Sequence, residues 1–500
     1  MAGNDKEAHG PAAIGGTDAS TDARHAQRGR VARAAKTNRG RTAFDNGPAA
    51  GATFVPDFSG AGSETGLSAA ETSGGAGAGQ VGIVELLRRN ANFRRLWLGQ
   101  VVSQLGDWFN TIALYTLVLE LTGSGRAVGL VLVARFVPSV VLGPLAGTIA
   151  DRFDRRAVMI VCDVGRAVVV LGFLLVRGAE DLWLVYALTA VQLTLSAFFE
   201  PAKSAAVPSV VAERELVTAN TITSVTWSAM LTLGAAVGGV MTAAFGSTAA
   251  FALDSLTYLL SAVFVAAVRL PRRPPRERRK LTLGGALGLA ETAEGAAYVR
   301  RRPRVMALLL VKPAWCVGGG ILTLLAVFGE RVFQLGGKTA LGVSALYAAR
   351  GVGTAVGPVV ARRFFSGTRR QMEQTIGWSF VVAGLFYALF GLAPGLLLAA
   401  VFVAAAHLGG SILWGFSTVL LQGMVGDEFR GRVFAAEMML LSLMLAASNY
   451  ATGEALDRLG LSPRAVAVAV GLFFVVPGLV WLWAVRLWDG DRRGGTSDDI

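Results

Sequence analysis

Long apolar segments dominate the chain from about residue 95 to residue 487. Twelve can be separated, and most begin or end at a glycine, a proline or a cluster of charges. They lie at 95–121, 126–150, 157–177, 182–201, 216–244, 247–268, 304–328, 338–364, 373–392, 395–422, 431–455 and 463–487. About 20 apolar residues cross a bilayer as a helix. Because these runs are continuous and do not alternate, they predict twelve transmembrane helices and exclude the strands of a membrane barrel.

A long polar linker divides the twelve segments into two sets of six. It is rich in arginine and proline, and residues 283–302 within it predict an amphipathic surface helix. The first 90 residues are rich in Gly, Ala, Ser and Thr and carry no long apolar run, which predicts a disordered tail. The predicted parts are the tail 1–90, the bundle 91–268, the linker 269–303, the bundle 304–487 and a C-terminal tail 488–500.

The two sets of segments repeat each other. Gly143-Pro144 and Arg155-Arg156 have counterparts at the same spacing in Gly357-Pro358 and Arg369-Arg370. Six is an even number of crossings, so both halves have the same orientation and are related by an axis along the membrane normal. The predicted fold is an all-α membrane protein of two six-helix halves, which hold a substrate between them.

Composition and motifs argue against other classes of protein. Hydrophobic residues make up 53% of the chain and charged residues only 16%, compared with about 25% charged in a soluble domain. Two cysteines and three scattered histidines exclude a metal cluster. Gly336–Thr339 is similar to part of an ATP-binding loop, but Val332 stands where that loop requires glycine. We expect neither an enzyme nor a bound cofactor or metal.

The net charge of +13 is explained by membrane topology. If the N-terminus is cytoplasmic, the loops on that side carry several times as many lysines and arginines as the loops on the other side. The chain is therefore expected to keep both termini in the cytoplasm. The bilayer accounts for the basic residues, and nucleic acid is not expected as a partner.

The segment 143–156 carries a recognisable motif, which reads GPLAGTIADRFDRR. It resembles the signature of the major facilitator superfamily, in which a glycine, an aspartate and basic residues follow at set spacing. The resemblance implies that this loop acts as a conformational latch. Glycine allows close helix packing, the aspartate can accept hydrogen bonds from a helix N-terminus or pair with an arginine, and the arginines anchor the loop. The latch residues are Gly147, Asp151, Arg152, Arg155 and Arg156.

Further stretches resemble one branch of that superfamily, the drug- and siderophore-efflux transporters, which include macrolide efflux proteins and enterobactin-type exporters. They are Asn92–Trp97, Ser103–Trp108, Asp163–Ala167, Pro201–Pro208, Ala219-Asn220 and Gly431–Val433. This resemblance covers about residues 90–487. It implies a monomeric exporter of a small molecule in a bacterial inner membrane, with protons as the coupling ion.

Two alternatives stay open beside export by proton antiport. Antiporters of the superfamily often carry a proline in the fifth helix that is missing from Gly234–Gly239, so a kink there is less assured. An importer would use the same fold, because rocking halves work in either direction. A membrane receptor or assembly factor that does not transport is the third possibility.

Ionisable residues inside the apolar segments are candidates for coupling or substrate contact, because each costs at least about 2.5–3.5 kcal/mol in mid-bilayer. At about 1.5 Å per residue, Asp107 and Arg135 come to nearly the same depth on consecutive helices. A pair between them would either exchange a proton or serve only as structural support. In the second half, Lys312, Arg350 and His407 have comparable depths. The excess of cations predicts tolerance for anionic or zwitterionic substrates.

Other charges lie nearer the cytoplasmic ends of the helices. Asp163 and Arg166 share one face of a helix at i,i+3, and we expect them close to Asp151. Together with Arg430 and Arg432 they form a predicted gating network. Glu437, one to two turns into its helix, is a weaker candidate for proton exchange.

Overall fold

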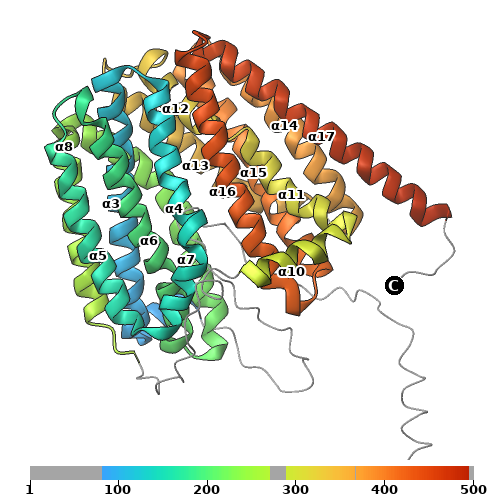
Figure 1. Ribbon diagram of the computed structural model, residues 1–500, viewed down its shortest axis with the longest axis horizontal. Helices are drawn as coiled ribbons and strands as arrows, with labels where there is room; N and C mark the ends of the chain where they lie inside the picture. Colours follow the sequence, from blue (N-terminus) through green and yellow to red (C-terminus); the bar gives the residue numbers. More distant parts are fainter. Residues whose placement is uncertain (1–81, 271–288, 366–367, 495–500) are drawn as a thin grey trace, which may run out of the picture. The chain divides into compact units, whose positions relative to one another are not determined.

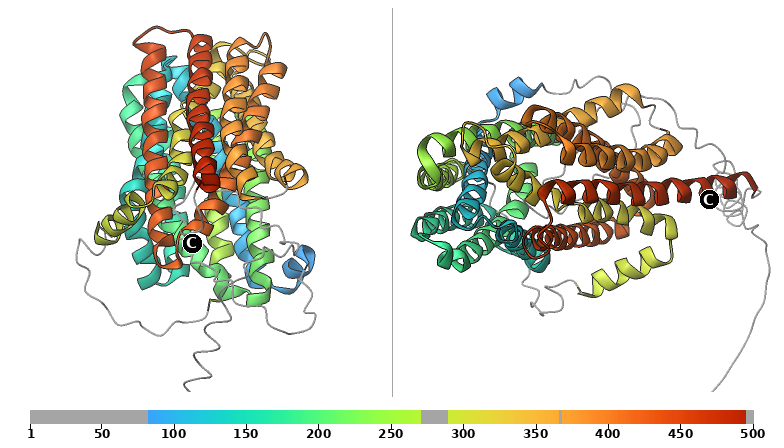
Figure 2. Two further views of the ribbon diagram at one scale, coloured as in Figure 1. Left: turned by 90° about the vertical axis from the view of Figure 1, so that its right-hand side faces the viewer. Right: turned by 90° about the horizontal axis from the view of Figure 1, so that it is seen from above.

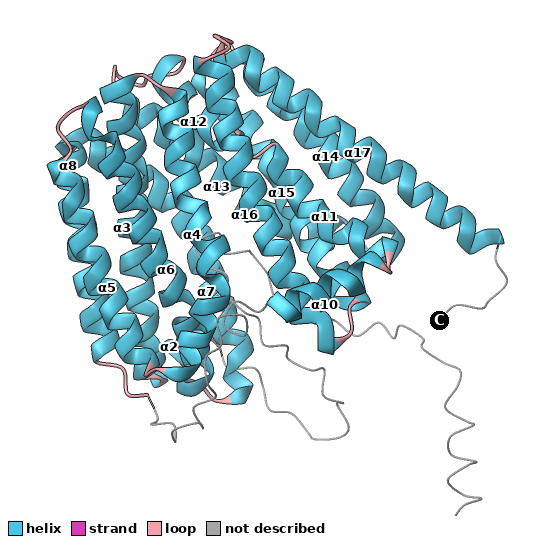
Figure 3. Cartoon of the chain, viewed as in Figure 1, coloured by secondary structure: helices cyan, strands magenta, loops and turns pink. Residues whose placement is uncertain are grey.

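The computed structural model describes residues 82–270, 289–365 and 368–494. Within these ranges the chain is helical apart from turns and one isolated bridge between Leu335 and Lys338 (Figure 3). Residues 1–81 and 271–288, most of the predicted tail and linker, lie outside the described residues.

The first half consists of six long membrane-crossing stretches after a short helix. The helices are α2 (Ile83–Arg89), α3 (Ala91–Thr122), α4 (Gly125–Arg152), α5 (Arg155–Gly172), α6 (Leu182–Val210), α7 (Leu216–Ala229) and α8 (Ala235–Ala266). A π-helical turn, Met230–Gly234, joins α7 to α8. Gly246, with φ 82° and ψ 168°, breaks α8. The predicted segments 216–244 and 247–268 are thus two crossings on either side of this glycine.

The second half repeats this arrangement after helix α10. Its helices are α10 (Leu289–Arg300), α11 (Pro303–Val317), α12 (Ile321–Arg331), α13 (Thr339–Phe364), α14 (Arg369–Leu392), α15 (Leu396–Met424), α16 (Asp427–Asp457) and α17 (Pro463–Gly494). The glycines 318–320 separate α11 from α12, which together form one crossing. In the described residues the predicted segments therefore correspond to twelve crossings. A criterion of length and composition alone accepts nine helical stretches as membrane spans, and one of them, 213–266, holds two crossings.

Polar caps fix where several helices begin. The side chains of Asn90, Ser124, Asp154 and Thr368 accept hydrogen bonds from the first turns of α3, α4, α5 and α14, which satisfies backbone donors that a helix leaves free. Gly123 ends α3 in the left-handed conformation, at φ 57°. These caps place the helix ends within a few residues of the ends of the apolar segments.

The two halves lie side by side (Figures 1 and 2). One end of the helices, which we call the linker end, holds α10 and the junctions α4–α5, α6–α7 and α15–α16. The opposite end holds the junctions α3–α4, α5–α6, α12–α13, α14–α15 and α16–α17. Within the halves α3 packs along α8 and α14 along α17, and between the halves α4 packs along α16.

The described structure begins inside the predicted tail. Leu86 of α2 is fully buried in a cluster with Phe93 and Ile222. Residues 83–89 thus belong to the helical part, because this short segment has an apolar residue that can pack on α3 and α7. The helix predicted at 283–302 corresponds to α10, which is described from Leu289.

Candidate functional site

A cavity of about 190 Å³ lies between the two halves. Asp107 of α3 and Arg135 of α4 line it from the first half, and Arg350 of α13 and His407 of α15 line it from the second. The structure thus brings four of the five predicted coupling or substrate residues to one cavity. The fifth, Lys312, is not among the lining residues.

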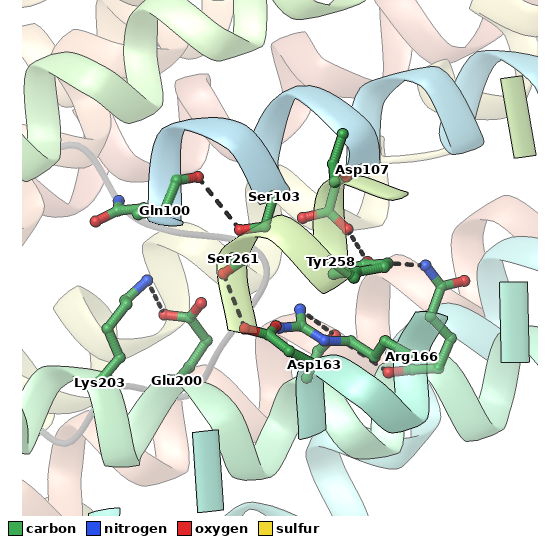
Figure 4. A network of polar contacts seen from close by, with 12 residues as sticks. Gln100, Ser103, Asp107, Asp163, Arg166, Glu200, Lys203, Tyr258 and Ser261 are labelled. Carbon is green, nitrogen blue, oxygen red and sulfur yellow. Dashed lines mark hydrogen bonds and ion pairs between the residues drawn. The ribbon is translucent and has the colours of Figure 1, made fainter. Parts of the chain in front are cut away.

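Asp107 belongs to a chain of hydrogen bonds (Figure 4). The hydroxyl of Tyr258, on α8, donates to its Oδ1. Gln192 Nε2 donates to the Tyr258 hydroxyl over 3.1 Å, and Asn110 Nδ2 donates to Gln192 Oε1 over 2.9 Å. Tyr258 is fully buried. Sequence reasoning missed it, because a tyrosine within an apolar segment gives no sign that it meets a carboxylate.

The predicted Asp107–Arg135 pair is wrong. Arg135 Nη1 donates to the hydroxyl of Thr111 over 3.3 Å, and in the described part of the chain no ion pair joins it to Asp107. The reason lies in the packing of α3, which runs along α8 and so presents Asp107 to Tyr258. The two charges share a cavity without touching.

Asp163 and Arg166 form the predicted i,i+3 pair on α5, and both are buried. Ser261 Oγ donates to Asp163 Oδ2 over 2.8 Å. The Arg166 guanidinium lies 4.4 Å from the ring centroids of both Phe199 and Tyr258. Tyr258 therefore contacts Arg166 and Asp107 at once (Figure 4), and of the pair it is Arg166 that lines the cavity.

The other two members of the predicted gating network lie in the second half. Arg430 Nη2 donates to the carbonyls of Gln422 and Val425 over 3.1 and 3.4 Å, at the end of α15. Arg432 Nη1 contacts Glu294 of α10 at 2.7 Å. Arg430 thus holds the α15–α16 junction and Arg432 joins α16 to α10, and the gating network stays a prediction.

The latch residues are described only in part. Gly147, Asp151 and Arg152 lie in the last turns of α4, and their side chains are outside the described part. Arg155 donates to the carbonyl of Ala205 in α6, and Arg156 to that of Ala266 at the end of α8. A cation at a helix C-terminus stabilises the carbonyls there. These two arginines thus hold α5 against α6 and α8 within the first half.

Lys312, a candidate for coupling or substrate contact, lies outside the lining of the cavity in a buried ion pair. Its Nζ lies 2.8 Å from Oε2 of Glu437 on α16, and the two side chains are 3% and 1% exposed. The ring centroids of Trp414 and Phe434 lie 5.2 and 5.5 Å from the same nitrogen. Trp414 lines the cavity, and Lys312 lies behind it. The Glu437 carboxylate neutralises the charge of Lys312 within the helix packing.

His407 and Arg350 differ in how they are held. Nδ1 of His407 lies 3.1 Å from the carbonyl of Val403, and the Tyr387 hydroxyl is 3.3 Å from the ring nitrogens. Arg350 has no ion pair in the described ranges, and its buried Nε has no hydrogen-bond partner there.

Polar contacts join the halves at the opposite end of the helices. Asp457 Oδ2, at the end of α16, accepts from Ser124 Oγ and from the backbone N–H of Arg126, both over 2.7 Å. Its Oδ1 lies 3.3 Å from Arg331 Nη2. Arg331 also donates to the carbonyl of Gly123. We call these residues the Asp457 cluster.

We expect Asp457→Ala to favour separation of the halves at the opposite end. The change removes the acceptor of three donors. Partly exposed contacts of this kind stabilise the joined halves by about 1 kcal/mol in total, so the ratio of molecules with separated halves to molecules with joined halves should rise about fivefold. Spin labels at Arg177→Cys and Gly395→Cys, at that end, should report a larger population of long distances. Arg458→Ala, the neighbouring exposed arginine, is the control and should leave the distances unchanged. An unchanged distribution in Asp457→Ala would show that the cluster does not hold the halves.

Comparison with known proteins agrees with this arrangement. The YfiS protein of Bacillus subtilis (strain 168), named an uncharacterized MFS-type transporter, is 26% identical over 446 residues, covering 81% of this chain and 96% of its own. Macrolide efflux protein A of Streptococcus pyogenes is 25% identical over 374 residues, covering 74% and 90%. The crystal structure of the nucleoside transporter NupG has the same fold, with a TM-score of 0.60 at 14% identity, covering 80% and 98%.

A family profile covers most of the helical part. The profile described as Major Facilitator Superfamily matches residues 96–448, from α3 into α16. The match includes both halves and most of the helices that wall the cavity. The chain is a membrane transporter that belongs to the Major Facilitator Superfamily.

Proposed function

We propose that this transporter exports a small molecule from the cytoplasm, with protons moving in the opposite direction. The observation that carries the proposal is the cavity between the halves, with polar contacts joining the halves at the opposite end. A site walled by both halves is suited to alternating access, in which one bundle rocks against the other around the substrate. The similarity to macrolide efflux protein A supports export as the direction.

The orientation belongs to the same proposal. The surplus of lysine and arginine at the linker end supports both termini in the cytoplasm, and a bacterial plasma membrane is the setting. With this orientation, the Asp457 cluster closes the outer side. The siderophore branch is supported only by the motifs of the sequence, and a single chain is taken to be the transporting unit.

Asp107 is the proposed proton carrier. It is a carboxylate on the cavity wall, held by the Tyr258 hydroxyl, and Tyr258 contacts the Arg166 guanidinium. Protonation of Asp107 removes a negative charge from the cavity wall. The electrostatic potential that a substrate meets there changes with it. A proton that binds Asp107 on the outer side and leaves it on the cytoplasmic side, in alternation with the substrate, would give antiport.

The test is proton movement in proteoliposomes under an imposed pH gradient, with a panel of macrolides, dyes and siderophores. An exported compound should collapse the gradient, and Asp107→Asn should lower that proton flux at least tenfold, as expected for loss of a general acid–base group. The matched control is Glu180→Gln, an exposed carboxylate in the α5–α6 junction. Compound movement without proton movement, or full flux in Asp107→Asn, would contradict the proposed coupling. If compounds move only into the cytoplasm, the protein is an importer and the proposed direction of transport is wrong.

A further inference from the structure

Among the described residues, four cationic side chains line the cavity, and two of them are neutralised within the protein. They are Arg135, Arg166, Lys203 and Arg350. Arg166 pairs with Asp163. Lys203 Nζ lies 2.6 Å from Glu200 Oε2, within the same helix. These two cations have carboxylate partners, so their charge is compensated without a ligand.

Arg350 lacks such a partner. Its side chain reaches the cavity from α13, and in the described residues it makes no ion pair and its buried Nε no hydrogen bond. A guanidinium cannot shed its charge in a protein, and an uncompensated charge in a water-poor interior is costly. An anion bound in the cavity would compensate it.

Arg135 faces the same cavity from the other half. Among the described residues, its one hydrogen-bond partner is the neutral hydroxyl of Thr111. Thr111 and Tyr115 are one turn apart on α3, and Tyr347 and Arg350 are about one turn apart on α13. The rings of Tyr115 and Tyr347 have centroids 5.8 Å apart. The tyrosine pair therefore lies between Arg135 of α4 and Arg350 of α13, neither of which forms an ion pair with a carboxylate among the described residues.

Aromatic side chains form much of the remaining wall. Trp108 packs edge-on to Tyr347, with centroids 6.2 Å apart. Trp315 and Trp414 line the cavity from the second half. Flat aromatic faces bind apolar or aromatic bodies, and indole and phenol groups add hydrogen bonds at the edge. The wall thus combines fixed positive charge with surfaces suited to a planar ligand.

We propose that the transported compound is an amphipathic organic anion, whose carboxylate or other planar acidic group binds Arg350 and Arg135 while its aromatic body rests on the surrounding rings. This deepens and rests on the proposed function, because it names the substrate class of the same cavity. Arginine forms paired, parallel hydrogen bonds with carboxylates. Because the two arginines belong to opposite halves, one anion between them would contact both bundles.

Two dyes with the same xanthene ring and opposite charge test this class. Fluorescein is an anion at pH 8 and rhodamine 123 is a cation. Binding is measured by fluorescence anisotropy with the purified full-length protein in lipid nanodiscs, without any gradient. We expect the wild type to bind fluorescein at least tenfold more tightly than rhodamine 123. Arg350→Gln should weaken fluorescein binding at least tenfold and leave rhodamine 123 binding equal or stronger.

Three further variants separate charge recognition from folding. Arg350→Lys keeps the charge without the planar fork and should bind fluorescein at an intermediate level. Arg135→Gln should act in the same direction as Arg350→Gln. Arg458→Gln, which changes an exposed arginine directly after α16, is the matched control and should bind like the wild type. Dye binding is compared only among variants that unfold at the same temperature as the wild type.

The outcomes separate this proposal from the proposed function. Preference of the wild type for rhodamine 123, equal fluorescein affinity in Arg350→Gln, or no saturable binding of either dye would overturn the anion site. Because the assay needs neither direction nor protons, fluorescein binding that depends on Arg350 would stand even if the proteoliposomes showed no antiport. Proton-coupled export of cations only would confirm the function and refute the substrate class.

Discussion

Glu437→Ala is expected to lower the free energy of unfolding by about 3–5 kcal/mol, the cost of removing one partner from a buried ion pair. The change leaves Lys312 of α11 facing α16 with its side chain 3% exposed and without another ion-pair partner among the described residues. The rings of Trp414 and Phe434 lie more than 5 Å from that nitrogen. Their attraction for a cation, about 0.5–2 kcal/mol, is too small to replace a carboxylate at 2.8 Å.

Thermal unfolding of the purified protein in detergent, followed by tryptophan fluorescence, measures this effect. The double variant Lys312→Met with Glu437→Leu should recover most of the lost stability, because apolar groups of similar volume replace buried ion pairs at little cost. Glu85→Ala breaks the exposed Glu85–Arg89 pair of α2, where the contact is 2.6 Å. As a control it should cost less than about 0.5 kcal/mol. Equal losses in Glu437→Ala and Glu85→Ala would show that burial does not govern the pair.

The same buried pair shows what the sequence could not establish. An ionisable residue within an apolar run marks Lys312 and Asp107 as unusual and fixes their depth. Depth does not give the direction in which a side chain points or the helix that it meets. Asp107 contacts Tyr258 and Lys312 contacts Glu437 because α3 packs along α8 and α11 beside α16. Those neighbours are set by contacts distant in sequence, which a single chain does not reveal.

The helices themselves were predictable, because length and hydropathy decide them locally. Even the division of α8 follows from one residue, Gly246, which takes a φ of 82° that other residues avoid. The break between α11 and α12 was missed because 304–328 is apolar over most of its length. Its reason is tertiary, since a Cβ on Gly318 would lie 1.5 Å from Phe474 and one on Gly320 would lie 1.9 Å from Thr452.

Gly129→Val is expected to lower transport at least tenfold without loss of folding. α4 of the first half crosses α16 of the second so closely that a Cβ on Gly129 would lie 2.7 Å from the carbonyl oxygen of Asn449. One turn away, a Cβ on Gly453 would lie 2.6 Å from the Cα of Arg126. Backbone atoms cannot move aside as a flexible side chain can, so a valine here must push the halves apart.

Overpacking of this kind costs about 1–3 kcal/mol, which is about a 5- to 150-fold change in an equilibrium between two conformations. That cost falls only on the state in which α4 and α16 touch, so the state with separated halves gains population. The spin labels at positions 177 and 395 should then report longer distances, as in Asp457→Ala but to a larger extent.

Gly415→Val is the matched control, because nothing lies within 4 Å of a Cβ there and the residue is likewise inside a membrane helix. Normal transport in Gly129→Val, or equal loss in both variants, would mean that the close crossing is not needed for the transport cycle. Loss in Gly129→Val alone, with fluorescein still bound at the cavity, would place the defect in the movement of the halves.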